Sequence, residues 1–140
     1  MRILVYARLM VLLGIAAIVL LSGSCDPSDL CRNELLKELK SPNGANKVVI
    51  FQRDCGATTG FSTQISILSS NEKLPNAGGD VFIADTNHGA APSSEGGGPV
   101  VEVTWIDDNN LLIKHDSQAR VSNSAKTHGT INISYATFPH

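Results

Sequence analysis

The residues best suited to chemistry lie in two short segments of the sequence. RDCGATTGFSTQ, residues 53–64, contains the thiol of Cys55, and DTNHGAAPSSEGGGP, residues 85–99, contains the carboxyl of Asp85 and the imidazole of His88. A thiolate paired with an imidazole that an acid orients is the arrangement of a cysteine-dependent hydrolase. A small hydrolase using Cys55 with His88 is therefore one hypothesis, although neither segment carries a recognisable nucleophile motif.

The second segment also suits binding without catalysis. Its polar side chains stand among glycines and prolines, which favour a loop, and loops on a rigid scaffold often carry binding residues. A metal site needs ligands held at fixed spacing, and an Asp-x-x-His pair in a glycine-rich loop does not provide it. We therefore expect no metal and no cofactor. The residues of the candidate binding loop are Asp85, Asn87, His88 and Glu95.

Two threonines follow Cys55 closely. Thr58 and Thr59 lie between glycines, where a tight turn is expected. Their hydroxyls are suited to satisfy backbone groups within that turn. The alternative is that they form a polar turn site that contacts a ligand.

The first 24 residues have the pattern of a signal peptide. Arg2 and Arg8 give a positive start, and residues 9–21 are an uncharged apolar run. That run is shorter than the ~20 residues that a membrane-spanning helix needs. LLSGSC resembles a bacterial lipobox, in which Cys25 becomes lipidated, although Ser22 replaces the usual leucine. Lipidation, plain secretion and an uncleaved anchor stay open, and all three place the chain outside the cytoplasm.

The location of the protein in the cell depends on which of these three alternatives holds. If Cys25 is lipidated, Asp26 becomes the second residue of the mature protein, which resembles the signal that retains lipoproteins in the inner membrane. The domain then faces the periplasm from the inner membrane. Without lipid, the protein is periplasmic or secreted.

The cysteine count then favours a disulfide. An exported chain with three cysteines has one left over after pairing. If Cys25 carries lipid, Cys31 and Cys55 remain, and an oxidising compartment favours a bond between them. A Cys25–Cys31 bond is the alternative that the sequence leaves open.

The rest of the chain reads as one β-rich domain, residues 25–140. Leucines near helical spacing predict an N-terminal helix over residues 28–40, and a turn follows it. Beyond that turn, alternating apolar and polar residues are typical of antiparallel strands. We expect an α+β, mostly β fold: a single antiparallel sheet or small sandwich of about six strands in meander order. The expected strands are residues 48–51, 61–68, 80–84, 101–105, 111–115 and 131–135.

Charge excludes one class of partner. The chain has 11 basic and 13 acidic residues, a net charge of −2, and no basic cluster. A nucleic-acid partner is not expected, because such proteins present a basic patch or stripe to phosphates.

RDCGATTGFSTQISIL, together with FIADTNHGAAP and VTWIDDNNLLI, resembles a group of small exported bacterial proteins of unassigned function. The resemblance implies a recurring lipoprotein-like domain and brings no activity with it. Our favoured interpretation is a non-enzymatic envelope protein. It is expected to be held at the membrane through an N-terminal lipid or anchor and to bind an envelope protein or cell-wall component.

Overall fold

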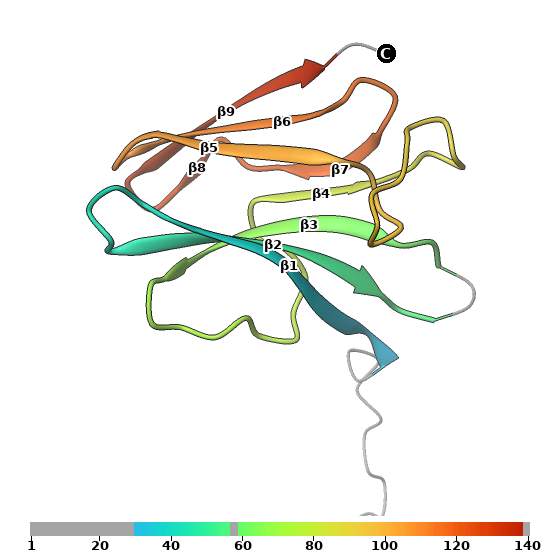
Figure 1. Ribbon diagram of the computed structural model, residues 1–140, viewed down its shortest axis with the longest axis horizontal. Helices are drawn as coiled ribbons and strands as arrows, with labels where there is room; N and C mark the ends of the chain where they lie inside the picture. Colours follow the sequence, from blue (N-terminus) through green and yellow to red (C-terminus); the bar gives the residue numbers. More distant parts are fainter. Residues whose placement is uncertain (1–29, 57–58, 139–140) are drawn as a thin grey trace, which may run out of the picture.

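The structure, a computed structural model, describes residues 30–56 and 59–138 (Figure 1). The expected signal peptide, residues 1–24, and the lipidation site Cys25 lie outside the described residues. The described residues form nine strands and contain no α-helix, and so no helix among them is long and apolar enough to cross a membrane. The strands are β1 (Arg32–Lys40), β2 (Asn46–Asp54), β3 (Ser62–Ser69), β4 (Phe82–Asp85), β5 (Val101–Asp107), β6 (Asn110–Asp116), β7 (Arg120–Ser124), β8 (Thr127–His128) and β9 (Ile131–Phe138).

The strands form two sheets, which lie one over the other in Figure 1. The first sheet has the order β1-β2-β3-β4-β7 and is antiparallel throughout. The second has the order β5-β6-β9-β8, in which β6 and β9 run parallel. After β6 the chain crosses to the edge of the first sheet as β7 and then returns through β8. This excursion is what makes β9 parallel to β6.

Alternation along the strands places the core between the sheets. On β2, Val48 and Ile50 face inward, whereas Val49 and Phe51 pack on the outer face with Leu68. From the second sheet, apolar side chains of β5, β6 and β9 meet the inner face of the first. The buried residues of the main core are Val48, Ile50, Ile65, Ile67, Val81, Phe82, Ala84, Val103, Leu111, Ile113, Ile131 and Ile133.

The predicted helix over residues 28–40 is wrong. Residues 32–40 form the edge strand β1, and residues 28 and 29 lie outside the described part of the chain. The cause is a β-bulge: Leu35 pairs with Phe51 and Lys37 with Ile50, which leaves Leu36 as an extra residue. A bulge shifts the two-residue alternation by one position, and the leucines therefore acquire a spacing that imitates a helix.

The predicted sheet arrangement is also wrong. We expected an α+β fold of about six strands in meander order, whereas the described residues form two sheets of five and four strands. The expected strands correspond to parts of β2, β3, β4, β5, β6 and β9. The polar strands β7 and β8 and the N-terminal β1 were missed. Because β7 pairs with β4 at the edge of the first sheet, the strands do not follow one another in meander order.

Tyr135 connects the two sheets. It lies on β9, stacks on Phe82 of β4 with 6.0 Å between ring centroids, and donates a hydrogen bond of 2.7 Å from its hydroxyl to Ala125 O. The hydroxyl also lies 3.2 Å from Val81 O, at hydrogen-bonding distance. Burial raises the pKa of Tyr135 to about 12. The neutral phenol is therefore the form that the folded protein favours.

We expect this phenol to make the fold sensitive to alkali. The unfolded chain loses the tyrosine proton near pH 10, earlier than the folded protein does. The contribution of Tyr135 to stability is thus complete below about pH 10 and is lost as the pH rises towards 12. The free energy of unfolding in urea, measured between pH 9 and 11.5, should fall more steeply with pH for the parent than for Tyr135→Phe. Parallel loss in the two proteins would contradict the assignment.

Candidate functional site

Cys55 is bonded to Cys31, as the cysteine count favoured. The bond joins the residue before β1 to the residue after β2, 24 positions apart in the chain. A disulfide is typical of an oxidising, non-cytoplasmic location. While the bond is intact Cys55 has no thiolate, and it lines neither of the two pockets described below. The hydrolase hypothesis therefore lacks its nucleophile.

The disulfide marks the end of the first sheet where the candidate residues gather. Antiparallel pairing brings the start of β1, the end of β2, the start of β3 and the end of β4 to this end. Two pockets lie here on either side of Phe61, which is 44% exposed and lines both. We name them the polar pocket and the acidic pocket.

The polar pocket has a volume of about 510 Å³. Its lining includes an ion pair between β4 and β7, in which Arg120 Nε and Nη2 donate to Asp85 Oδ2 at 2.9 and 2.7 Å. Asp85 and Arg120 are direct partners in the strand register, which fixes the pair. The lining residues are Thr59, Gly60, Phe61, Ser62, Asp85, Thr86, His88 and Arg120.

The environment of Asp85 keeps its carboxyl ionised. Burial by itself raises the pKa, but the hydrogen bonds from Arg120 and from Asn87 N outweigh it, and the charge of Arg120 and the proximity of His88 lower the pKa further. The net pKa of Asp85 is therefore below its ordinary value. A carboxylate held in this state accepts hydrogen bonds, and it is unsuited to act as a general acid at neutral pH.

A tight turn after β4 presents His88. Asn87 N donates to Asp85 Oδ1 at 2.8 Å, and Ala91 N donates to Thr86 O at 3.0 Å. Asn87 and His88 have φ angles of 50° and 57°, in the left-handed region. Asn87 Nδ2 reaches across to Gln118 O at 3.3 Å, which ties the turn to the segment before β7.

Thr59 satisfies the backbone of its own turn and also lines a pocket. Its Oγ1 donates to Gly56 O at 3.1 Å, and its backbone N donates to the same oxygen at 3.1 Å. The polar pocket includes it together with Asp85 and His88. Thr58 lies outside the described residues.

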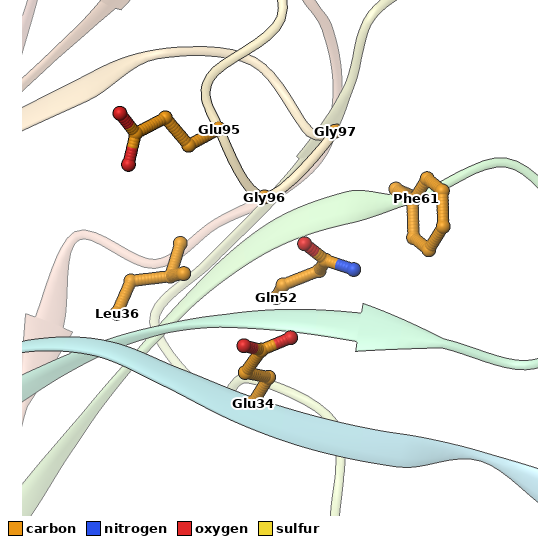
Figure 2. A pocket seen from close by; sticks show the side chains of 7 residues that line it. All are labelled: Glu34, Leu36, Gln52, Phe61, Glu95, Gly96 and Gly97. Atoms are coloured by element: carbon orange, nitrogen blue, oxygen red, sulfur yellow. The ribbon is translucent and has the colours of Figure 1, made fainter.

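The acidic pocket lies on the other side of Phe61 and has a volume of about 330 Å³ (Figure 2). Glu34 and Leu36 come from β1 and Gln52 from β2, whereas the glycine-rich loop supplies the opposite wall. Leu36, the bulged residue, is 41% exposed. The lining residues are Glu34, Leu36, Gln52, Phe61, Glu95, Gly96 and Gly97.

Gln52 is the unusual member of this pocket. It is a polar side chain that continues the inward-facing row of Val48 and Ile50, and it is only 8% exposed. Its Oε1 is buried without a hydrogen-bond donor among the described residues. Leaving such an oxygen unpaired costs about 1–3 kcal/mol. Figure 2 shows its side chain rising from β2 towards Gly96, with the carboxylate of Glu34 beside it.

The glycines allow the loop to descend onto the sheet. A Cβ on Gly96 would lie 2.5 Å from Gln52 Oε1, and one on Gly98 would lie 2.5 Å from the backbone N of Thr63. The turn is closed by Ser94 N, which donates to Gly98 O at 2.7 Å, and anchored by Thr63 Oγ1, which donates to Pro99 O at 2.7 Å. The EGGGP sequence thus serves close backbone approach.

The structure divides the predicted binding residues between the two pockets. Asp85, His88 and Thr59 meet in the polar pocket, and Asn87 supports the turn beside it, whereas Glu95 lines the acidic pocket. Sequence reasoning missed Glu34, Leu36, Gln52, Phe61 and Arg120 as site residues. For Gln52 a signal existed, because it lies two positions beyond Ile50 in a buried row. For Arg120 there was none, since its pairing with Asp85 spans 35 residues.

Within residues 30–56 and 59–138, no three histidine, cysteine or carboxylate side chains come together as a metal site requires. Fold and site together define a two-sheet, disulfide-bonded β domain with adjoining pockets at one end. Comparison with protein-family models, with curated protein sequences and with solved structures gave no match.

Proposed function

We propose that this protein is a non-enzymatic binding domain of the bacterial cell envelope, held at the membrane through Cys25. The observation that carries the proposal is the Cys31–Cys55 bond at the pocket end of the domain. It occupies the thiol on which the hydrolase alternative depends and is consistent with an exported protein. What remains at this end is a pair of concave surfaces with convergent polar groups and an aromatic ring, the features of a binding site.

The polar pocket favours a hydrogen-bonding ligand. Asp85 and Arg120 supply an acceptor and a donor, Ser62 and Thr59 supply hydroxyls, and Phe61 supplies an exposed ring face. A sugar or short peptide of the cell wall, or a loop of an envelope protein, presents complementary groups. The expected partner is therefore an envelope protein or cell-wall component.

A lipid on Cys25 would hold this end close to the membrane. Cys31 lies six positions after Cys25, which limits the tether to about 20 Å even when it is fully extended. With Asp26 as the second residue of the mature protein, the proposed location is the periplasmic face of the inner membrane.

Acyl labelling of the parent and its absence in Cys25→Ser test this tether. Labelling equal in the two proteins would contradict it.

We expect the polar pocket to be required for capture. Full-length tagged protein should retain a bound component when it is isolated from its native envelope, and Asp85→Asn with Arg120→Gln should lose that component while remaining folded. An exposed ion pair contributes at most about 1 kcal/mol to stability, so the double variant folds. Glu72→Gln, an exposed change in the loop after β3, is the matched control. Equal capture by all three proteins would overturn the proposal.

A further inference from the structure

The acidic pocket has a composition that the polar pocket does not share. Its polar side-chain atoms are the carboxylates of Glu34 and Glu95 and the amide of Gln52, and no lysine, arginine or histidine lines it. In the described part of the chain, neither carboxylate takes part in an ion pair. The pocket therefore repels anions and offers acceptors to a cationic donor.

Gln52 gives this pocket a second, independent feature. More than nine-tenths of the residue is buried, its side chain lies in the pocket wall, and its Oε1 has no donor among residues 30–56 and 59–138 (Figure 2). In the structure this oxygen lies beneath Gly96 and does not face the open side of the pocket. Half a turn about the last side-chain torsion, which has a broad energy profile, would bring it to the open side, where an amide oxygen is suited to receive an N–H from a ligand.

The apolar lining indicates what the cation is attached to. Leu36 and Phe61 are both substantially exposed and stand on opposite sides of Gln52 in Figure 2. Between them a methylene chain finds contact with apolar surface, and a cation near the Phe61 ring gains cation–π attraction. A bare metal ion or a strongly hydrated cation would make no use of these two side chains.

We propose that the acidic pocket binds a primary ammonium group on an alkyl chain, the chemistry of a lysine side chain or another diamino acid. Gln52 Oε1 accepts an N–H from the ammonium, Glu34 balances its charge, and Glu95 attracts it at the rim. Leu36 and Phe61 contact the chain. The inference rests on the proposed function, because the ammonium belongs to the envelope component that the domain binds.

The test is a titration of the full chain, labelled with ¹⁵N, with n-pentylamine and with its neutral analogue n-pentanol. Pentylamine should shift the amide signals of Gln52, Gly96 and Phe61 saturably. Pentanol should bind about tenfold more weakly or worse, because a hydrogen bond to a charged group is lost. Equal binding of the two probes would overturn the inference.

Two variants sharpen the test. Gln52→Met keeps the length of the side chain and removes the unpaired oxygen, so it should weaken pentylamine about tenfold and raise the melting temperature. Glu72→Gln, which removes an exposed carboxylate that lines neither pocket, should bind pentylamine as the parent does. Unchanged pentylamine affinity in Gln52→Met would mean only general attraction to acidic residues, and the inference would fall.

Two further comparisons separate ligand source and proposed function. Tighter binding of Nα-acetyl-lysine methylamide than of pentylamine supports a lysine-type residue in a peptide, whereas the reverse order supports a free alkylamine. Envelope capture without pentylamine binding overturns this inference alone. Pentylamine binding without envelope capture overturns the proposed function and leaves the ammonium site standing.

Discussion

Replacing Cys31 and Cys55 together by serine is expected to lower the free energy of unfolding by about 3 kcal/mol. The bond links two residues 24 positions apart, and removing it restores the conformational entropy of the loop between them to the unfolded chain. The double replacement leaves no unpaired thiol at this end. Denaturant titration at neutral pH measures the effect as a lower midpoint, together with a steeper slope because the unfolded chain without the crosslink exposes more surface.

Chemical reduction provides the control for this result. The parent treated with a reductant should unfold at the same midpoint as the serine variant, and mass spectrometry without reduction should find the Cys31–Cys55 peptide pair in the untreated parent. An oxidised parent no more stable than the variant would contradict the prediction. A free, alkylatable Cys55 in protein from an oxidising compartment would return the hydrolase hypothesis.

The bond also affects the site, because it fixes the edge of the sheet that the acidic pocket uses. β1 is an edge strand paired on one side only, and its exposed face carries charged residues of high helix propensity. Pairing with β2, the disulfide, and the hydrogen bond of 3.1 Å from Trp105 Nε1 to Leu39 O hold it in place. Without the disulfide, the wall of the acidic pocket that contains Glu34 and Leu36 should become its most mobile part.

The sequence predicted strands well where one face is buried and the other is wet. In β9, Ile131, Ile133 and Tyr135 alternate with polar residues, and Ile131 and Ile133 lie in the core. The alternation can be recognised in the sequence because whether a residue is apolar or polar depends only on which face of the sheet its side chain occupies. The number of cysteines predicted the disulfide without any knowledge of the fold, since three thiols allow few pairings.

Prediction failed where a residue's partner lies far along the chain. The bulge at Leu36 is defined against Phe51 and Ile50, and without that register the leucine spacing favours a helix. β7 is polar along its exposed face and becomes a strand by pairing with β4. Sheet order is decided by such pairings, which no local pattern contains.

The candidate site shows the same division. Asp85, His88 and Glu95 were found because polar residues in a glycine-rich loop are conspicuous, but their grouping was not predicted: Glu95 lies across Phe61 from the other two. Gln52 was missed because a single polar residue at a strand end has no meaning until the covering loop is known. Gly96 of that loop lies against Gln52 of β2 and Gly98 against Thr63 of β3, and therefore the loop is less open than its composition suggests.

Phe82→Ala is expected to destabilise the fold more than truncation of any exposed side chain. The ring is 0% exposed between the sheets, with its centroid 5.4 Å from that of His115 and 6.0 Å from that of Tyr135. Truncating a buried phenylalanine to alanine typically costs about 3–5 kcal/mol, a large part of the stability of a small domain. Thermal and denaturant unfolding measure the loss.

Phe61→Ala is the matched control, because it makes the same chemical change at a ring that is 44% exposed. It should cost far less stability while weakening binding in both pockets, which it lines. Phe82→Ala should instead loosen β4, whose last residue, Asp85, pairs with Arg120. Binding to the polar pocket would then fall together with the unfolding midpoint, and stabilising osmolytes should restore both. Equal destabilisation by the two alanine variants would show that Phe82 does not anchor the sheets as the packing indicates.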